Sequence, residues 1–174
     1  MKKEIEIKFK LENKENINKK LEELGGQKKK PYTQTAYDFF SDESVKKGIF
    51  PRIRIEAGIP ILTVKVKNNK KKTNYFERNE YSLKISNFKT GIKILKILGF
   101  DKIRRFTKVR TQWVFRRRPI EVCVDKLYFG RFLELEASKK EIEKMIKSLG
   151  FQRRKRISKA YLAIEEEYKK AKIK

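Results

Sequence analysis

Near its start the chain reads Glu4-Ile5-Glu6-Ile7-Lys8-Phe9. Charged and apolar residues alternate through this stretch without a break. Because successive side chains of a β-strand point to opposite faces of the sheet, a period of two predicts a strand with one apolar face and one ionised face. The ionised face carries two carboxylates and one ammonium group side by side.

Seven further segments show the same alternation. Together with Glu4–Lys10 they predict eight strands, the others lying at Gln34–Phe40, Phe50–Glu56, Ile61–Lys67, Tyr75–Ile85, Thr107–Phe115, Ile120–Lys126 and Phe132–Ala137. Apolar residues three and four positions apart predict four helices, at Asn13–Leu24, Thr90–Leu98, Ser138–Leu149 and Ser158–Lys172. The polar stretch Asn68–Lys72 is predicted to be a hairpin loop.

The polar faces of these strands are charged and sorted by sign. The first and last two strands are rich in acids, at Glu4, Glu6, Glu121, Asp125, Glu134 and Glu136. The middle strands are rich in bases, at Arg52, Arg54, Lys65, Lys67, Arg78, Lys108 and Arg110. One interpretation is that these faces simply point to water, as in most half-buried sheets. The other is that helices cover the apolar faces and the charged faces line a closed antiparallel barrel, where a ligand must compensate the charges.

We favour the second interpretation, which gives an α+β fold: an eight-stranded antiparallel β-barrel flanked by helices. No Pro/Gly/Ser-rich linker divides the 174 residues, so we expect one domain over residues 1–174. A water-filled interior with both signs of charge suits metal ions at its carboxylates and a polyphosphate at its Lys and Arg residues.

The composition narrows the chemistry further. Lys and Arg number 47 against 22 Asp and Glu, a formal net charge of +25, which points to a polyanionic partner. The absence of histidine excludes Ser-His-Asp and Cys-His catalysis as well as His-ligated zinc. A single cysteine, Cys123, cannot form an internal disulfide, and no apolar run approaches the ~18 residues of a membrane span, so we expect a cytoplasmic protein.

Several short motifs, in a fixed order, resemble one known family. They are Glu4-Ile5-Glu6-Ile7-Lys8, Tyr37-Asp38-Phe39-Phe40, Arg52-Ile53-Arg54, Thr63-Val64-Lys65, Glu77-Arg78-Asn79-Glu80, Lys108-Val109-Arg110 and the segment from Val124-Asp125 through Gly130 and Phe132 to Glu134-Leu135-Glu136. Their types and order resemble the CYTH superfamily of triphosphate tunnel metalloenzymes. The resemblance runs from residue 4 to about residue 165 and implies an eight-stranded tunnel. The C-terminal Ser-Tyr-x-Asp-like segment of the family is matched only in part, by Ala160-Tyr161-Leu162-Ala163.

The resemblance and the sorted charges together assign candidate roles. The candidate ligands of Mg²⁺ or Mn²⁺ are Glu4, Glu6, Asp125, Glu134 and Glu136. The candidate triphosphate-binding residues are Lys8, Arg52, Arg54, Lys65, Arg78, Lys108 and Arg110. The candidate catalytic residues are Lys8, Arg78 and Glu136, and Glu80 is expected to orient one of the basic residues. Rim or structural roles are expected for Asp38, Glu121, Lys67 and Lys84.

The family contains two kinds of activity, cyclisation of a nucleoside triphosphate and hydrolysis of a triphosphate. The overall layout favours a class IV adenylyl-cyclase-like enzyme, which converts ATP to cyclic AMP and pyrophosphate. The alternative is a triphosphatase that hydrolyses tripolyphosphate, a nucleoside triphosphate or thiamine triphosphate. A homodimer is suggested by the resemblance to class IV cyclases.

A more remote alternative is a basic RNA-binding protein. It would use the runs Lys28-Lys29-Lys30, Arg116-Arg117-Arg118 and Gln152-Arg153-Arg154-Lys155-Arg156. The competing explanation for each run is an ordinary solvated loop.

Overall fold

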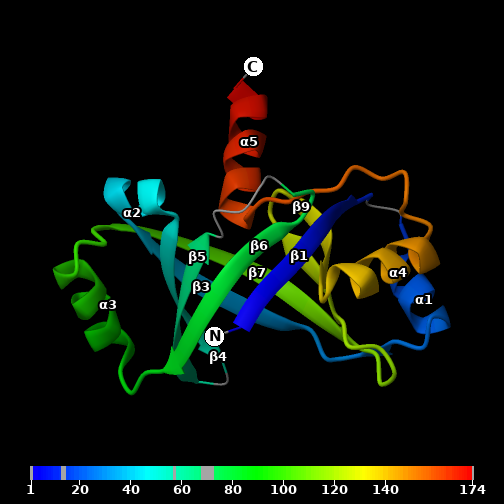
Figure 1. Cartoon of the computed structure of the whole chain (residues 1–174), viewed down its shortest axis with the longest axis horizontal. Coiled ribbons are helices and arrows are strands. Elements are labelled where there is room, and N and C mark those ends of the chain that lie inside the picture. Colours follow the sequence, from blue (N-terminus) through cyan, green and yellow to red (C-terminus); the bar gives the residue numbers. More distant parts are fainter. Residues whose placement is uncertain (1, 13–14, 57, 68–72, 174) are drawn as a thin grey trace. The chain divides into compact units, whose positions relative to one another are not determined.

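A computed structural model of the chain describes residues 2–12, 15–56, 58–67 and 73–173, so the predicted hairpin loop at Asn68–Lys72 lies outside the described residues (Figure 1). The strands are β1 (Lys2–Leu11), β2 (Gln27–Lys28), β3 (Tyr32–Phe40), β4 (Ile49–Glu56), β5 (Ile59–Lys67), β6 (Phe76–Lys84), β7 (Lys102–Val114), β8 (Glu121–Leu127) and β9 (Gly130–Glu136). The helices are α1 (Ile17–Glu23), α2 (Asp42–Lys47), α3 (Phe88–Ile97), α4 (Lys139–Leu149) and α5 (Tyr161–Ile173). Among the helices described, none is long and apolar enough to cross a membrane.

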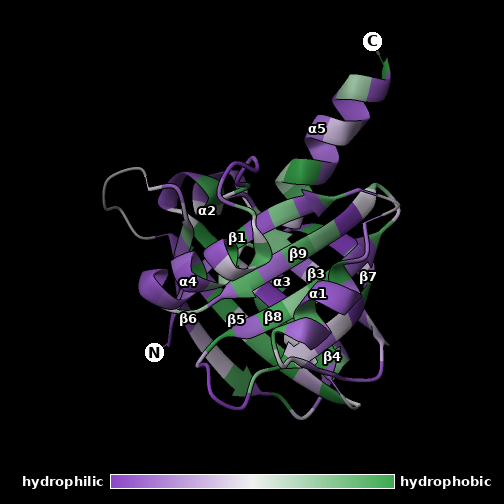
Figure 2. Cartoon of the chain, turned by 90° about the vertical axis from the view of Figure 1, so that its right-hand side faces the viewer, coloured by the Kyte–Doolittle hydropathy of each residue, from purple (hydrophilic) through white to green (hydrophobic). Residues whose placement is uncertain are grey.

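The hydrogen-bonded order of the strands confirms the predicted barrel. The order is β2-β7-β3-β4-β5-β6-β1-β9-β8, and an additional pairing of β7 with β8 closes it into a ring of eight strands. The short strand β2 pairs with β7 outside this ring. Each pair whose register is known is antiparallel. Along the strands, hydrophilic and hydrophobic residues alternate, as the period of two requires (Figure 2).

All eight predicted strands are present, with ends that shift by up to five residues. Two short elements, β2 and α2, were not predicted, because two and six residues are too short to show a period. Helix α2 is fixed instead by its ends, where Ser41 and Ser44 exchange side-chain hydrogen bonds and Gly48 adopts the left-handed conformation at φ 68°. Helix α1 begins at Ile17, because the Asn16 side chain accepts a hydrogen bond from the amide of Lys19 and caps it there.

The chain forms two compact units. The first unit comprises Met1–Glu4, Gln34–Lys71 and Glu77–Thr107. The second unit comprises Ile5–Thr33, Lys72–Phe76 and Lys108–Lys174. Strands β1, β3, β6 and β7 contribute residues to both units.

The core of the second unit is large and lies between its strands and two helices. Helix α4 buries an apolar stripe of Ile142, Met145, Ile146 and Leu149 against apolar residues of β1, β8 and β9. The rings of Phe9 and Phe151 meet edge to face at 5.4 Å between centroids. In this unit helices cover most of the apolar strand faces, as predicted, although Val109 on β7 remains 41% exposed.

The core of the first unit is smaller, and here the prediction of covered apolar faces is only partly right. Helix α3 packs on Phe39 and Ile53 through Leu95, and Gly91 allows the close approach, because a Cβ there would lie 2.5 Å from Ile85 Cδ1. On β6, however, Tyr81 and Leu83 remain 48% and 56% exposed. The ten-residue α3 provides only this one packing face, formed around Leu95.

Candidate metal and phosphate site

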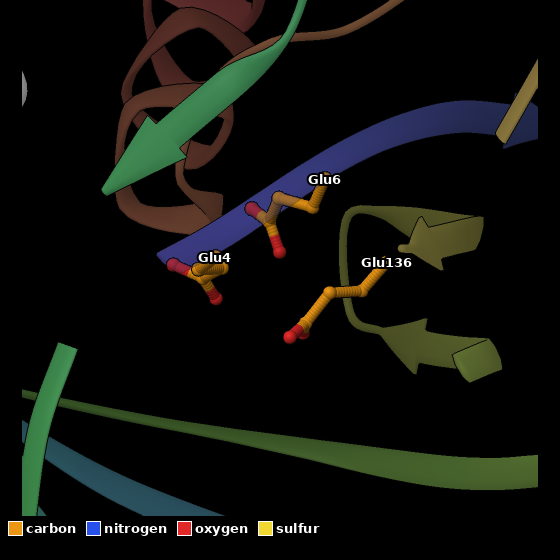
Figure 3. A group of neighbouring side chains, drawn as sticks. All are labelled: Glu4, Glu6 and Glu136. Carbon is orange, nitrogen blue, oxygen red and sulfur yellow. The ribbon is translucent and has the colours of Figure 1, made fainter. Parts of the chain in front are cut away.

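Three carboxylates come together on β1 and its neighbour β9. Glu6 lies opposite Glu136 in the register of the two strands, and Glu4 lies two residues earlier on the same face of β1. One oxygen from each of Glu4, Glu6 and Glu136 lies within 4.8 Å of the other two, and their side chains point toward one another (Figure 3). Glu4 and Glu6 are buried, and Glu136 is half-buried.

This group fits a hard divalent cation. Its donors are all carboxylate oxygens, which Mg²⁺ and Mn²⁺ prefer over softer metals. Carboxylates this close repel one another when ionised, and burial makes the repulsion harder to screen. Lys65 and Lys8 already pair with Glu4 and Glu6, and a divalent cation held by the three carboxylates would reduce the repulsion that remains. The metal assignment of Glu4, Glu6 and Glu136 made from the sequence is therefore compatible with the geometry.

The other two candidate metal ligands have different neighbours. Asp125 on β8 is completely buried and accepts hydrogen bonds from Arg110 Nε at 2.7 Å, Arg110 Nη2 at 2.7 Å and Lys108 Nζ at 2.8 Å. Glu134 on β9 accepts from Arg110 Nη2 at 2.6 Å and lies 3.5 Å from Lys8 Nζ. Both acids are compensated by cations of the chain itself, as Glu4 and Glu6 also are. Among the described residues, only the group around Glu6 brings three carboxylates within 4.8 Å of one another. The role of all five acids as metal ligands stays a prediction.

The pKa values of this network follow from burial and its charges. Burial alone would raise the pKa of the Glu134 carboxyl, but the charges of Arg110, Lys108 and Lys8 hold it well below its usual range. Burial is also the largest influence on Lys108, and it lowers the pKa of that ammonium group despite the nearby Glu134 and Asp125. The network thus keeps Glu134 ionised, while the charge on Lys108 depends on its acidic neighbours.

Lys8 connects the network to the carboxylate group. Its side chain is 2% exposed and pairs with Glu6 as well as with Glu134. The ammonium group also lies over the rings of Tyr161, 5.0 Å from the centroid, and Phe76, at 5.4 Å. A buried cation beside three clustered carboxylates is a suitable partner for an anionic substrate oxygen.

Tyr161 is a site residue that was assigned no role from the sequence. It is the first residue of α5, and its hydroxyl donates a 2.8 Å hydrogen bond to Asp125 Oδ2. Burial and the nearby charges of Glu134 and Asp125 raise the pKa of the phenol well above its usual value. The partial match of Ala160-Tyr161 to a family motif was the signal that could have identified it.

In the first unit, Lys65 joins two acids. Its ammonium group lies 2.8 Å from Glu4 Oε1 and 2.6 Å from Glu80 Oε1. Burial would raise the pKa of Glu80, but the charge and hydrogen bond of Lys65 lower it overall. Glu80 thus holds a candidate phosphate-binding residue, the positioning role expected for it.

The remaining candidate phosphate-binding residues of the first unit lie on β4 and β6. Arg52 makes two hydrogen bonds to the buried Asp38, at 2.5 and 3.3 Å, and its guanidinium lies 5.3 Å from the Phe106 ring centroid. Arg54 pairs with Glu56 at 2.8 Å. On β6, Arg78 donates to the carbonyl of Glu77 at 2.8 Å. Of the four residues expected to have rim or structural roles, Asp38 holds Arg52, Glu121 lies 3.8 Å from Arg110, and Lys67 and Lys84 are exposed at strand ends.

Comparisons with known proteins agree with this fold and these strands. The CYTH domain matches residues 2–162 of the chain. A protein of Methanocaldococcus jannaschii named "Putative adenylate cyclase" is 31% identical over 155 residues, which cover 84% of this chain and 83% of that protein. A solved structure from Pyrococcus horikoshii superimposes with a TM-score of 0.75 at 23% identity, over 94% of this chain and 98% of the other.

A second solved structure comes from Hippeastrum. It has a TM-score of 0.55 and 17% identity over 85% of this chain and 88% of the other, and it is named as a putative adenylyl cyclase with a dominant triphosphatase activity. At these identities the two structures support the fold alone. The match of the family to nearly the whole chain, together with the 31% identical relative, shows that the chain belongs to the CYTH domain family.

Proposed function

We propose that the chain is a divalent-metal-dependent enzyme that acts on the phosphoanhydride bonds of a triphosphate. The observation that carries the proposal is the group of Glu4, Glu6 and Glu136, with the buried Lys8 paired to Glu6. A divalent cation held by these carboxylates would neutralise phosphoryl oxygens and make the phosphorus more electrophilic. The proposal treats residues 1–174 as one catalytic domain, supported by a family match that spans both units.

The chain's own cations would bind the phosphates. They are the seven candidates Lys8, Arg52, Arg54, Lys65, Arg78, Lys108 and Arg110. Several of these already have acidic partners, such as Asp38 for Arg52 and Asp125 for Arg110, which fix their position before substrate binds. Such fixed cations stabilise the charge that develops on the leaving phosphate without a reorganisation step.

The first candidate reaction is the cyclisation of ATP. The ribose 3′-oxygen bonds to the α-phosphorus, the bond from that phosphorus to the bridging oxygen breaks, and pyrophosphate leaves. Glu136, the least buried carboxylate of its group, would accept the 3′-hydroxyl proton, and Arg78 would stabilise the pyrophosphate. The name of the 31% identical relative from Methanocaldococcus jannaschii supports this candidate.

The second candidate is hydrolysis of the terminal phosphate. Water attacks the terminal phosphorus, its proton passes to the same carboxylate, and a diphosphate leaves. This reaction needs no contact with a nucleobase or a ribose. The dominant triphosphatase activity named for the Hippeastrum protein supports it.

The test is a product analysis with ATP, tripolyphosphate and thiamine triphosphate, each with Mg²⁺ and with Mn²⁺. Cyclic AMP and pyrophosphate identify the cyclase, whereas orthophosphate from any of the three identifies the triphosphatase. Glu6→Gln and Glu136→Gln should each lower turnover by at least 10²-fold, while Glu22→Gln, on the exposed surface of α1, should not change it. If no substrate yields product with either metal, the proposal is wrong.

A further inference from the structure

The second unit carries a basic pocket that the proposed reaction does not use. The pocket has a volume of about 470 Å³ and lies between the turn before β8 and one side of α4, from Glu141 to Ser148. Its lining includes four cationic side chains, Arg117, Arg118, Lys144 and Lys147. Glu141 is its one carboxylate, and Pro119 and Ser148 complete the lining. The excess of cations over acids makes the pocket a site for an anion.

Two of the four cationic side chains of the pocket are available to bind an anion. Within the described part of the chain, Arg117 and Lys147 make no ion pair, and both are exposed. Arg118 donates to Ser148 Oγ at 3.4 Å, and Lys144 pairs with Glu141 at 2.7 Å, so these two are held in place. The pocket therefore combines two positioned cations with two that lack a counter-charge.

The cations continue beyond the pocket along the solvent face of α4. Lys140, Lys144 and Lys147 follow one another at spacings of four and three residues, which places them on one face of the helix. At 1.5 Å per residue they span about 10 Å along the axis. The arginine run begins one residue before the pocket, at Arg116, which is also exposed. A row of this length suits an extended polyanion better than a single phosphate group.

The lining also indicates what kind of polyanion fits. It contains no aromatic side chain, and its one apolar residue is Pro119, so a base would find no ring on which to stack. Recognition must then rest on phosphates alone. An isologous contact with a second copy of the chain is disfavoured, because it would bring two cationic rows together on molecules of net charge +25.

We propose that the pocket and the adjoining lysine row of α4 bind the phosphodiester backbone of a nucleic acid without base preference. Of the three basic runs in the sequence, Arg116-Arg117-Arg118 is the one that forms this surface. The run at 152–156 is partly consumed within the fold, because Arg154 pairs with Glu15 at 2.8 Å and Arg156 makes two hydrogen bonds to Glu143.

The test is fluorescence anisotropy with 5′-fluorescein-labelled 20-mers of uridine and of deoxythymidine. Both lack a triphosphate, and EDTA is present, so the candidate metal site does not contribute. In a plot of log K against log salt concentration, each phosphate contact of a single strand steepens the slope by about 0.7. One contact therefore raises the affinity about fivefold when the salt concentration falls from about 1 M to about 0.1 M. The double substitution Arg117→Gln/Lys147→Gln should therefore weaken binding about 25-fold at 0.1 M salt and lower the slope by about 1.4.

The matched control is Lys89→Gln/Lys93→Gln on the exposed surface of α3, which removes the same charge outside the pocket. It should change the affinity less than threefold. Equal loss in the two double variants would show only a general attraction to the basic surface and would overturn the proposal. So would no binding of either oligonucleotide, or binding of inorganic polyphosphate alone.

The outcome is independent of the proposed enzyme. The active-site variant Arg52→Gln/Arg54→Gln, which removes two candidate triphosphate-binding cations, should keep the nucleic-acid affinity of the unaltered protein, and Arg117→Gln/Lys147→Gln should keep its triphosphate turnover. A loss of nucleic-acid binding in Arg52→Gln/Arg54→Gln as large as in Arg117→Gln/Lys147→Gln would place the polyanion in the candidate phosphate site and contradict the assignment to α4.

Discussion

Substitution of Asp125 by asparagine is expected to destabilise the protein severely. The Asp125 carboxylate is completely buried. It compensates the positive charges of Arg110 and Lys108 and accepts a hydrogen bond from the Tyr161 hydroxyl. Asparagine keeps the volume but loses the charge, and its amide group would point a donor at donors. Removal of one partner from a buried ion pair typically lowers the free energy of unfolding by about 3–5 kcal/mol, because the remaining charge stays buried without compensation.

The measurement is urea unfolding followed by circular dichroism. With a slope of about 2 kcal/mol per M, a loss of 3–5 kcal/mol moves the midpoint down by about 1.5–2.5 M. Asp101→Asn is the matched control: Asp101 is exposed, and its loss should change the free energy of unfolding by less than about 0.5 kcal/mol. In the double variant Asp125→Asn/Lys108→Met, removal of one stranded cation should restore about 1–3 kcal/mol.

A loss below about 1 kcal/mol in Asp125→Asn would refute this reasoning. It would mean that Arg110 and Lys108 have other compensation in solution, which makes Asp125 free to bind a metal. The experiment therefore also tests whether this acid acts as a partner of basic residues or as one of the five candidate metal ligands.

Three further outcomes are expected. The pKa of Glu134 is lower in the folded protein than the unfolded value of about 4.3. Its ionised carboxylate therefore stabilises the fold above the unfolded pKa, and this stability is lost as the pH falls through the lower folded pKa. The free energy of unfolding, measured from pH 5 to pH 2, should depend less on pH in Glu134→Gln than in the unaltered protein. Mn²⁺ at 100 times its dissociation constant should stabilise the protein by about 2.7 kcal/mol in thermal unfolding, a shift that Glu136→Gln should remove and Glu22→Gln should keep. Gly48→Ala should lower the free energy of unfolding in urea more than Gly58→Ala does. Both glycines have a positive φ, but a Cβ at Gly48 would lie 2.5 Å from the Cβ of Lys67, whereas a Cβ at Gly58 would meet nothing within 4 Å.

Much of the fold was predictable because its signal is local. A strand repeats every two residues, so the alternation in Glu4–Lys10 and seven other segments located all eight strands of the ring. The same alternation put Glu4 and Glu6 on one face of β1. The spacing of apolar residues that predicts a helix at Ser138–Leu149, observed as α4, was equally visible in the sequence. Elements too short for a period, such as β2 and α2, were not.

The sequence by itself determined the strands, the sign of charge on each strand face and the family. Only the tertiary structure decided which acid meets which base. The register of β1 and β9 places Glu136 opposite Glu6. The register of β7 and β8 places Arg110 opposite Asp125, and Arg110 compensates the charge of that carboxylate. These pairings depend on contacts between strands distant in sequence, and a register shift of one residue would turn every charged side chain to the other face. The physical reason is that periodicity is a property of one strand, while electrostatic compensation is a property of several.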